Sequence, residues 1–302
     1  MTGFIELSIE LGSLAAERVE AACFDAGAGA VTYVDAQDDP VLEPLPGEFR
    51  LWPATCIRAL FAETFDAAAL ARTLAEPLGQ PLALIQVQRV ADRVWEREWL
   101  RDFHAMRFGK RLWVCPHHEQ VTEADAVVVH MDPGLAFGTG THPTTALCLE
   151  WLDSHVTPGA CVIDYGCGSG VLAVAAVRLG ARAAHCFDID PQALIATRGN
   201  AHANGLAGRV HIHESADELP RGADTLISNI LSGPLCELAP RLASLIRPDG
   251  EIVLAGLLEA ESSDVTRAYS ACFDMRPFGA REGWVVLSGR RRSCTPSAPN
   301  AL

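Results

Sequence analysis

The first 92 residues alternate strand-like and helix-like hydrophobic patterns. Phe4 to Glu10 places apolar and polar side chains at period two, which predicts a strand with one buried face. Ser13 follows as the N-cap expected for a helix that runs to about Ala26. The remaining predicted elements are a strand over Ala30–Val34, a strand over Phe49–Ile57, a helix over Asp66–Leu78 and a strand over Ala83–Val90. This order, βαββαβ, is that of a ferredoxin-like sandwich.

Three aromatic residues recur every four positions in the stretch 94–107, at Trp95, Trp99 and Phe103. In a helix, residues four apart lie on one face. We therefore predict a helical linker whose aromatic face packs on a neighbouring domain. A ligand site is the alternative, but an aromatic stripe at this spacing is more often packing.

Short apolar runs alternate with helical patterns after residue 110, which predicts a mostly parallel sheet. Phe273–Phe278 and Trp284–Leu287 predict a terminal hairpin around Gly283, and Gly289 to Leu302 is expected to be a disordered tail. The strands expected before the hairpin are Arg111–Cys115, Ala126–His130, a run ending at Asp164, Ala183–Phe187, Arg209–His213, Thr225–Ser228 and Glu251–Gly256.

A glycine-rich turn follows the strand that ends at Asp164. Its glycines stand at 166, 168 and 170, and the aliphatic run Val171–Leu179 predicts a buried helix directly after it. Residues without Cβ let the backbone approach a ligand closely, next to the free N–H groups of the helix. A dinucleotide fingerprint would require a third glycine at position 171. The spacing therefore disfavours NAD and resembles the first motif of class I S-adenosylmethionine (SAM) methyltransferases, although a purely structural turn remains an alternative.

A second unusual stretch, Asp132–Thr145, contains three glycines and four threonines. Pro143 suits the first turn of a helix, which would place Thr141 and His142 at its N-terminus. Amides and hydroxyls at a helix N-terminus can hold a carboxylate. We interpret this stretch as part of a binding site, the alternative being a capping loop.

Two further polar residues end predicted strands. Asp188 comes 22 residues after Gly166, where a carboxylate can accept hydrogen bonds from ribose hydroxyls. Asp190 is expected instead to cap the helix that begins at Pro191. Asn229 ends another strand, and open α/β sheets bind ligands at that carboxyl edge.

The composition and net charge of the chain limit the classes of macromolecule that it is expected to bind. The chain has 302 residues and a net charge of −14, which argues against a phosphate-rich partner and fits a basic protein better. Residues 1–93 contain six arginines and fourteen acids with few strand aromatics, unlike RNA-binding modules of this topology. We interpret this module as a protein-docking domain, the alternative being a regulatory or stabilising domain.

The ten cysteines contain no C-x-x-C pair, so free cysteines and no metal site are expected. No signal peptide or long apolar span appears, which predicts a cytoplasmic protein without a membrane partner.

Together these motifs resemble the ribosomal protein L-eleven methyltransferase (PrmA) family. The resemblance rests on Asp132–Thr145, Ile163–Gly170, Asp188–Pro191 and Asn229–Pro234. It implies an α/β fold, a class I SAM methyltransferase Rossmann-like domain with a mostly parallel seven-stranded sheet and terminal antiparallel hairpin, preceded by a small ferredoxin-like α+β domain. The implied organisation is a docking domain over 1–93, a helical linker over 94–109, a methyltransferase domain over 110–289 and a disordered tail over 290–302.

The resemblance also implies an activity, transfer of methyl groups from SAM to the α-amine and lysine side chains of the large-subunit ribosomal protein L-eleven. The positions matching Thr145, Gly166, Asp188 and Asn229 would contact SAM, and Asn229 is our candidate to orient the amine. We place the remaining cofactor contacts at Phe137, Gly138, Thr139, Asp164 and Gly168. A monomer without sequence-specific nucleic-acid binding is expected.

Two other functions stay open at this point. The chain could methylate another protein or nucleic-acid amine, although such families usually carry Asn-Pro-Pro-Tyr/Phe where this chain has Asn-Ile-Leu-Ser. It could also be a non-catalytic SAM-binding module associated with the ribosome. The sequence does not indicate the number or positions of the methyl groups added, or whether free protein or assembled ribosome is the substrate.

Overall fold

The computed structural model describes residues 3–37, 51–79, 85–90, 103–131, 138 and 140–293. The chain divides into two compact units, Met1–Val94 and Trp95–Leu302. None of the helices in the described ranges is long and apolar enough to cross a membrane.

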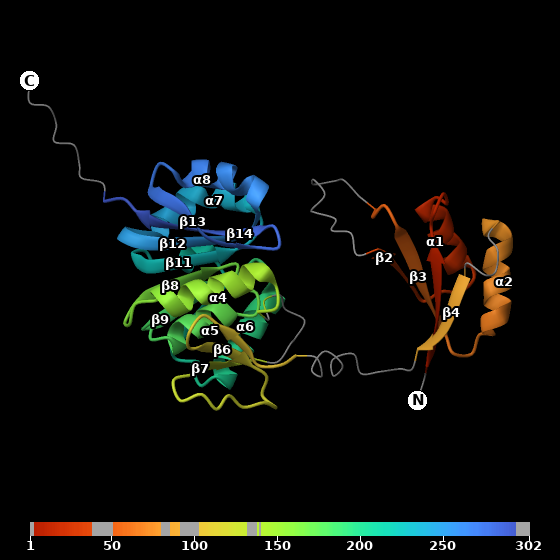
Figure 1. The fold of residues 1–302 in the computed structure, drawn as a ribbon, viewed down its shortest axis with the longest axis horizontal. Coiled ribbons are helices and arrows are strands. Elements are labelled where there is room, and N and C mark those ends of the chain that lie inside the picture. Colours follow the sequence, from red (N-terminus) through yellow and green to blue (C-terminus); the bar gives the residue numbers. More distant parts are fainter. Residues whose placement is uncertain are drawn as a thin grey trace, which may run out of the picture. The chain divides into compact units, whose positions relative to one another are not determined.

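The first unit is a four-stranded antiparallel sheet with two helices on one face (Figure 1). Ile5, Leu7 and Ile9 alternate inward along the central strand β1 and form the core with both helices. The order in the sheet is β2-β3-β1-β4. The elements are β1 (Phe4–Glu10), α1 (Ala16–Asp25), β2 (Ala30–Asp35), β3 (Thr55–Ala62), α2 (Ala67–Leu78) and β4 (Ile85–Val90).

Two local predictions in this unit are wrong. Ser13 does not cap α1, whose N-cap is Ala15, because Leu14 N–H donates to Leu11 O (2.7 Å) and closes a turn around Ser13. The strand predicted over Phe49–Ile57 begins only at Thr55. Pro53, which has no N–H for a sheet, lies in the turn just before it.

The second unit is built on a seven-stranded sheet of order β10-β9-β8-β11-β12-β14-β13. The first five strands are parallel and β14 is antiparallel to both of its neighbours. The predicted mostly parallel sheet with a terminal hairpin is therefore confirmed. Its strands are β8 (Cys161–Tyr165), β9 (Ala183–Phe187), β10 (Val210–His213), β11 (Ala223–Asn229), β12 (Ile246–Leu258), β13 (Phe273–Arg281) and β14 (Trp284–Arg291).

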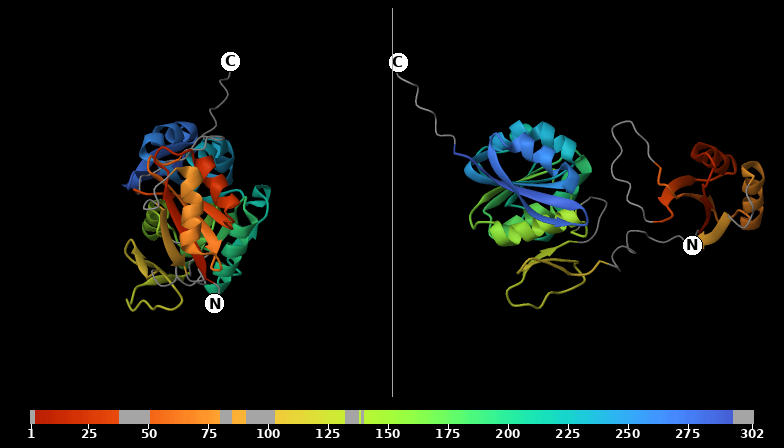
Figure 2. Two further views of the ribbon diagram at one scale, coloured as in Figure 1. Left: turned by 90° about the vertical axis from the view of Figure 1, so that its right-hand side faces the viewer. Right: turned by 45° about the horizontal axis from the view of Figure 1, so that its top comes forward.

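Helices cover both faces of this sheet (Figures 1 and 2). One buried cluster joins α4, α5 and α6 to the first face, and a second joins α7 and α8 to the other. The helices are α4 (Pro143–His155), α5 (Val171–Arg178), α6 (Pro191–Ala203), α7 (Ser232–Leu245) and α8 (Ser262–Tyr269), with the short 3-10 turns η2 (Ala216–Glu218) and η3 (Glu259–Glu261).

The hairpin between β13 and β14 turns through Glu282 and Gly283, both with positive φ (54° and 79°). Such values at both central residues match the twist of a two-residue hairpin. The strand β14 continues to Arg291, so the disordered tail predicted from Gly289 begins too early. Pairing with β12 and β13 holds this polar segment, and Arg292 bonds to Asp274 (2.8 Å). Residues 294–302 lie outside the described ranges.

A small three-stranded sheet, β5-β6-β7, packs against α4 and α5. Its strands are β5 (Met106–Phe108), β6 (Leu112–Cys115) and β7 (Val127–His130). The linker helix predicted to Arg107 is wrong at its C-terminal end, because 103–105 have no regular structure and β5 pairs with β6 instead. Trp95 and Trp99 lie outside the described ranges.

Candidate active site

The candidate site lies where the parallel strands β8, β9 and β11 end. The N–H groups of Gly166 and Cys167 donate to Phe187 O at 2.8 and 3.1 Å, which ties the glycine turn to the end of β9. Because neighbouring parallel strands end at one edge, residues distant in sequence meet there. The structure thus brings the predicted glycine turn, Asp188 and Asn229 to a common edge.

The glycine turn requires residues without side chains for two reasons. Gly166, Gly168 and Gly170 have φ of 79°, 54° and 77°, a region that L side chains rarely adopt. A Cβ on Gly166 would also lie 2.3 Å from Ile230 Cγ2, and a Cβ on Gly170 would lie 2.7 Å from Thr197 Cγ2. The backbone conformation and the packing of Ile230 and Thr197 therefore restrict Gly166 and Gly170 to glycine.

Asp188 is oriented by backbone donors. Gly168 N–H donates to its Oδ2 and Asp190 N–H to its Oδ1, both at 2.9 Å. A carboxylate oxygen has two lone pairs, so both oxygens keep acceptor capacity for ligand hydroxyls. Asp190 caps α6 by accepting from Gln192 N–H (2.9 Å), as predicted. Between these acids, Ile189 is 89% exposed and offers an apolar surface beside the site.

Asn229 and Thr145 form a polar contact between β11 and α4. Asn229 Nδ2 donates to Thr145 Oγ1 at 3.2 Å, and Thr145 is buried. The amide oxygen of Asn229 therefore remains an acceptor that the Thr145 bond does not use. The helix bearing Thr145 begins at Pro143, with His142 as N-cap, as the sequence predicts.

Gly138 is held near the helix that follows the glycine turn. Its carbonyl oxygen accepts a hydrogen bond from Ser169 Oγ at 2.6 Å. A Cβ on Gly138 would lie 3.0 Å from the same Oγ, so this position is also close-packed. The predicted contacts Phe137 and Thr139 lie outside the described ranges.

Asp164 lies beneath the turn, with 1% of its surface exposed. Its Oδ2 accepts from Ala173 N–H in α5 (3.1 Å), while Oδ1 is buried and has no hydrogen-bond partner among the described residues. Burial raises the pKa of Asp164 to about 7, against the Ala173 bond that lowers it. A buried acid with one unsatisfied oxygen suits a ligand or water that donates to it.

One aromatic residue at this edge was not predicted. The ring of Trp284 packs edge-on against His142, with centroids 4.9 Å apart, so the terminal hairpin reaches the N-terminus of α4. Burial lowers the pKa of His142, while the charge of Glu282 on the same hairpin raises it. The sequence signal was available, since Trp284 directly follows the hairpin glycine, but nothing local connects it to residue 142.

Three histidines form a cluster across the neighbouring strands β9 and β10. His185 on β9 stacks against His211 and His213 on β10, and its Nδ1 lies 3.0 Å from Nε2 of His213. Burial, followed by the two neighbouring histidines and Arg182, lowers the pKa of His185 to about 4. Within the described ranges no three His, Cys, Asp or Glu residues are grouped so that they could hold a metal ion.

The polar groups at this edge fit SAM. Both carboxylate oxygens of Asp188 keep acceptor capacity for ribose hydroxyls, and Asp164 carries an unsatisfied buried oxygen beneath the glycine turn. An adenine ring would find the exposed Ile189 next to Asp188.

Comparison with known proteins gives concordant matches. The family model described as "Ribosomal protein L11 methyltransferase (PrmA)" matches residues 3–292. The ribosomal protein L11 methyltransferase of Haemophilus influenzae (strain PittEE) is 46% identical over 293 residues, covering 96% of this chain and 99% of that protein. The enzyme of that name from Pseudomonas aeruginosa (strain LESB58) is 48% identical over 279 residues, covering 92% and 95%.

A solved structure agrees. The ribosomal protein L11 methylase of Lactobacillus delbrueckii subsp. bulgaricus is 28% identical with a TM-score of 0.57, over 63% of this chain and 100% of that chain. With the family match spanning both units and the carboxyl-edge site in place, this chain belongs to the ribosomal protein L11 methyltransferase (PrmA) family of SAM-dependent enzymes.

Proposed function

We propose that this protein methylates the N-terminal α-amine and lysine side chains of ribosomal protein L11. The observation that carries the proposal is the family match, which runs through both compact units and not only through the SAM-binding part. The names of the Haemophilus and Pseudomonas relatives support the same substrate.

In the proposed mechanism SAM, when bound, supplies an electrophilic methyl group on its sulfonium. The turn at Gly166 and Gly168 and the carboxylate of Asp188 would hold it, with Thr145 and Gly138 on the facing segment. Because Thr145 occupies the Nδ2 group of Asn229, the Oδ1 atom of Asn229 is the group that orients the acceptor amine. Bound SAM would supply the methyl carbon for a direct displacement, in which a nitrogen–carbon bond would form as the carbon–sulfur bond broke; the methylated nitrogen would then lose its surplus proton to water. Proximity supplies the remaining acceleration.

The site must favour a neutral amine. An α-amine has a pKa near ~8 and needs little help at neutral pH, whereas a lysine near ~10.4 must lose a proton first. Removal of water from the site disfavours the charged form and lowers the pKa of a bound lysine. The apolar surfaces of Ile230 and Trp284 at this edge support such an environment.

The first unit is proposed to dock the protein substrate. Its βαββαβ order and antiparallel sheet of order β2-β3-β1-β4 support a ferredoxin-like domain over 1–93. The sheet face opposite the helices carries Glu6 and Glu10 on β1, with Gln86 and Gln88 paired beside that strand on β4. Arg58 on β3 is paired with Ser8 and shares this face, so the two glutamates of β1 outnumber one arginine there. A face with this acidic excess and these amides suits a basic ribosomal protein. The proposal includes a linker that ends before β5 (Met106–Phe108) and a methyltransferase domain that extends to the end of β14 at Arg291. It also includes a cytoplasmic location and a monomeric enzyme without sequence-specific nucleic-acid binding.

The test is incubation of the protein with radiolabelled SAM and purified L11, followed by mass spectrometry of the product. Label on L11 at amino groups is the expected result. Wild-type SAM binding without label in L11 would rule out this activity and favour a non-catalytic module or another substrate. Glu6→Lys/Glu10→Lys is expected to raise KM for L11 and to leave SAM affinity unchanged.

A further inference from the structure

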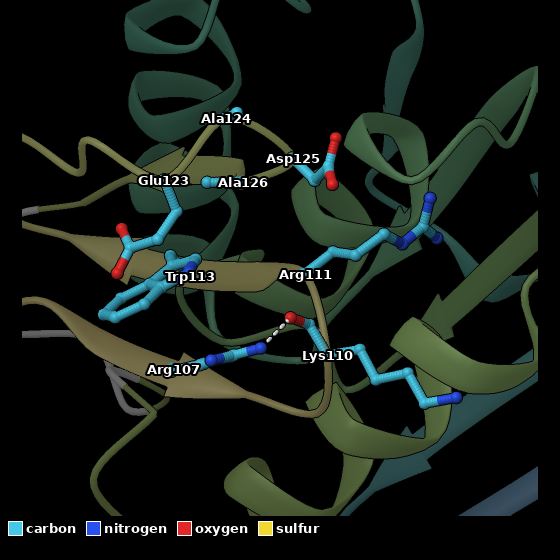
Figure 3. A pocket seen from close by; sticks show the side chains of 8 residues that line it. All are labelled: Arg107, Lys110, Arg111, Trp113, Glu123, Ala124, Asp125 and Ala126. Atoms are coloured by element: carbon cyan, nitrogen blue, oxygen red, sulfur yellow. Dashed lines mark hydrogen bonds between the residues drawn. The ribbon is translucent and has the colours of Figure 1, made fainter.

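A pocket lined by none of the candidate SAM-site residues lies on the small sheet β5-β6-β7. Its volume is about 540 Å³, within the range of small-ligand sites (Figure 3). The other face of the sheet is buried in the core through Phe108, Leu112, Val114 and Val129. The pocket is therefore on the outward face. Its lining residues are Arg107, Lys110, Arg111, Trp113, Glu123, Ala124, Asp125 and Ala126.

The pocket combines an aromatic ring with a guanidinium held against it. Arg107 and Trp113 are partners across the β5–β6 pair, so their side chains share the outward face. The Arg107 guanidinium carbon lies 6.0 Å from the centroid of the Trp113 ring, and its Nη2 donates to Lys110 O. The guanidinium of Arg107 is thus held by two contacts, one with the indole ring and one with a backbone carbonyl oxygen. A partly exposed tryptophan beside an arginine on a sheet is the arrangement on which single-stranded bases stack.

The turn that presents the other two cations is anchored to the core. The N–H groups of Lys110 and Arg111 donate to the buried carboxylate of Asp153, at 2.6 Å for Lys110 and 3.3 Å for Arg111. Gly109 has φ of 71°, and a Cβ there would lie 2.5 Å from Asp153 Oδ2. None of the described acids forms an ion pair with the Lys110 ammonium, whereas Arg111 Nε lies 3.7 Å from Asp153. Lys110 is also the only lysine of the chain.

The facing wall is acidic. Glu123 and Asp125 precede β7, and Figure 3 shows Glu123 on the Trp113 side of the pocket and Asp125 on the Arg111 side. Both acids are exposed. Carboxylates accept hydrogen bonds from the exocyclic amino groups of bases. The pocket therefore offers cations, an aromatic face and carboxylate acceptors at once.

We propose that this pocket binds a nucleotide that carries an exocyclic amino group, with the phosphate on Lys110 and Arg111, the base against Trp113 and the amino group on Glu123 or Asp125. An acidic peptide would satisfy the cations but would leave the indole unused and face the two carboxylates. A nucleotide uses all three features. Residues 1–93 lack this combination of cations and an aromatic ring, because they contain six arginines against fourteen acids and few strand aromatics. The nucleotide can be free or part of an RNA strand.

The experiment titrates the full-length protein, saturated with S-adenosylhomocysteine to block the cofactor site, with fluorescent single-stranded oligo(A) and oligo(U), and with AMP. Oligo(A) is expected to bind more tightly than oligo(U), because uracil has no amino group. The two cations assigned to the phosphate, Lys110 and Arg111, predict a slope of log K against log salt of about −1.4. Binding of AMP as well as oligo(A) identifies a mononucleotide site, and binding of oligo(A) alone identifies an RNA contact; both support the proposal.

Variants locate the site. Trp113→Ala is expected to weaken oligo(A) binding by about 5- to 150-fold, the range for loss of one stacked base. Arg107→Glu/Lys110→Glu should also abolish most of the salt slope, and Glu123→Gln/Asp125→Asn should reduce the preference for oligo(A) over oligo(U). Arg276→Ala, an exposed arginine on β13, is the matched control and should bind as wild type. Unchanged binding of S-adenosylhomocysteine checks that each variant is folded, and Trp113→Phe provides a milder replacement.

Three outcomes would overturn the proposal. One is no binding of AMP or either oligonucleotide at low salt. Another is an equal loss in Arg276→Ala and Arg107→Glu/Lys110→Glu. The third is binding of poly-glutamate as tight as that of oligo(A), which would identify a site for anions in general. Methyl transfer to L11 does not enter these measurements, so failure here leaves the proposed function untouched.

Discussion

Asn229 Nδ2 donates a hydrogen bond to Thr145 Oγ1 at 3.2 Å, joining the end of β11 to the first turn of α4 across 84 residues of sequence. This bond fixes the side-chain amide so that its oxygen is available to an amine. Asn229 therefore has a defined orientation before any substrate arrives.

Thr145→Val, which keeps the shape but removes the hydroxyl, is expected to lower kcat by about tenfold, equivalent to ~1.4 kcal/mol, because the amide can then rotate. Thr145→Ser should retain most activity. Asn229→Ala is expected to lose turnover far more than SAM affinity. The measurement is a double-mutant cycle on kcat, with SAM affinity by calorimetry. If the two substitutions were additive, the bond would not act in positioning; equal losses of turnover and affinity in Asn229→Ala would make that residue only a cofactor contact.

Gly166→Ala is expected to abolish measurable SAM binding for two reasons. The new Cβ would lie 2.3 Å from Ile230 Cγ2, and the alanine would have to adopt a φ of 79°. Gly205→Ala is the matched control, since Gly205 has φ of 67° but open space around its Cβ position. The control should show only the backbone cost, about 1–2 kcal/mol of unfolding free energy. Ile230→Ala in the Gly166→Ala background should recover part of the SAM affinity in calorimetry. No recovery would show that the conformation of the turn, and not the clash, limits binding.

Asp164 should make the protein less stable as the pH rises. Its folded pKa is about 7 and its unfolded pKa is near ~3.9, so the folded state binds more protons between these values. Each pH unit in that window then costs up to about 1.4 kcal/mol of unfolding free energy, and below pH ~4 the penalty is absent. Asp164→Asn should remove this dependence. Urea unfolding from pH 4 to 8 measures it, and parallel curves for the two proteins would contradict the prediction.

His185 should make the protein less stable as the pH falls, the opposite of the effect of Asp164. Its folded pKa is about 4 and its unfolded pKa near ~6.5, so the unfolded state takes up the proton first as the pH falls. Stability is complete above pH ~6.5 and is lost towards pH 4, by less than ~1.4 kcal/mol per pH unit because solvent screens the partly exposed ring. His185→Gln should flatten that part of the stability curve. The ring's titration can be followed directly by NMR, and a midpoint near 6.5 would refute the shift.

The fold was predictable where neighbouring residues carry the signal. The strand predicted over Phe4–Glu10 has the same first and last residues as β1. The helices α2, α6 and α4 also begin where Asp66, Asp190 and Pro143 predict. The secondary-structure predictions were wrong where a segment is a strand because of the strands that pair with it. The strand β14 extends through Gly289 to Arg291 because β12 and β13 bond to it from both sides. The segment Met106–Phe108 is a strand because β6 lies beside it.

The sequence by itself determined the order of strands and helices, the glycine turn and the identity of the polar residues at strand ends, because periodicity, φ preference and capping depend on residues close along the chain. Only the tertiary structure decided that Thr145 meets Asn229, that Ile230 lies over Gly166 and that Trp284 packs on His142. These contacts depend on which strands are neighbours in the sheet, a property of the whole chain that no local pattern encodes.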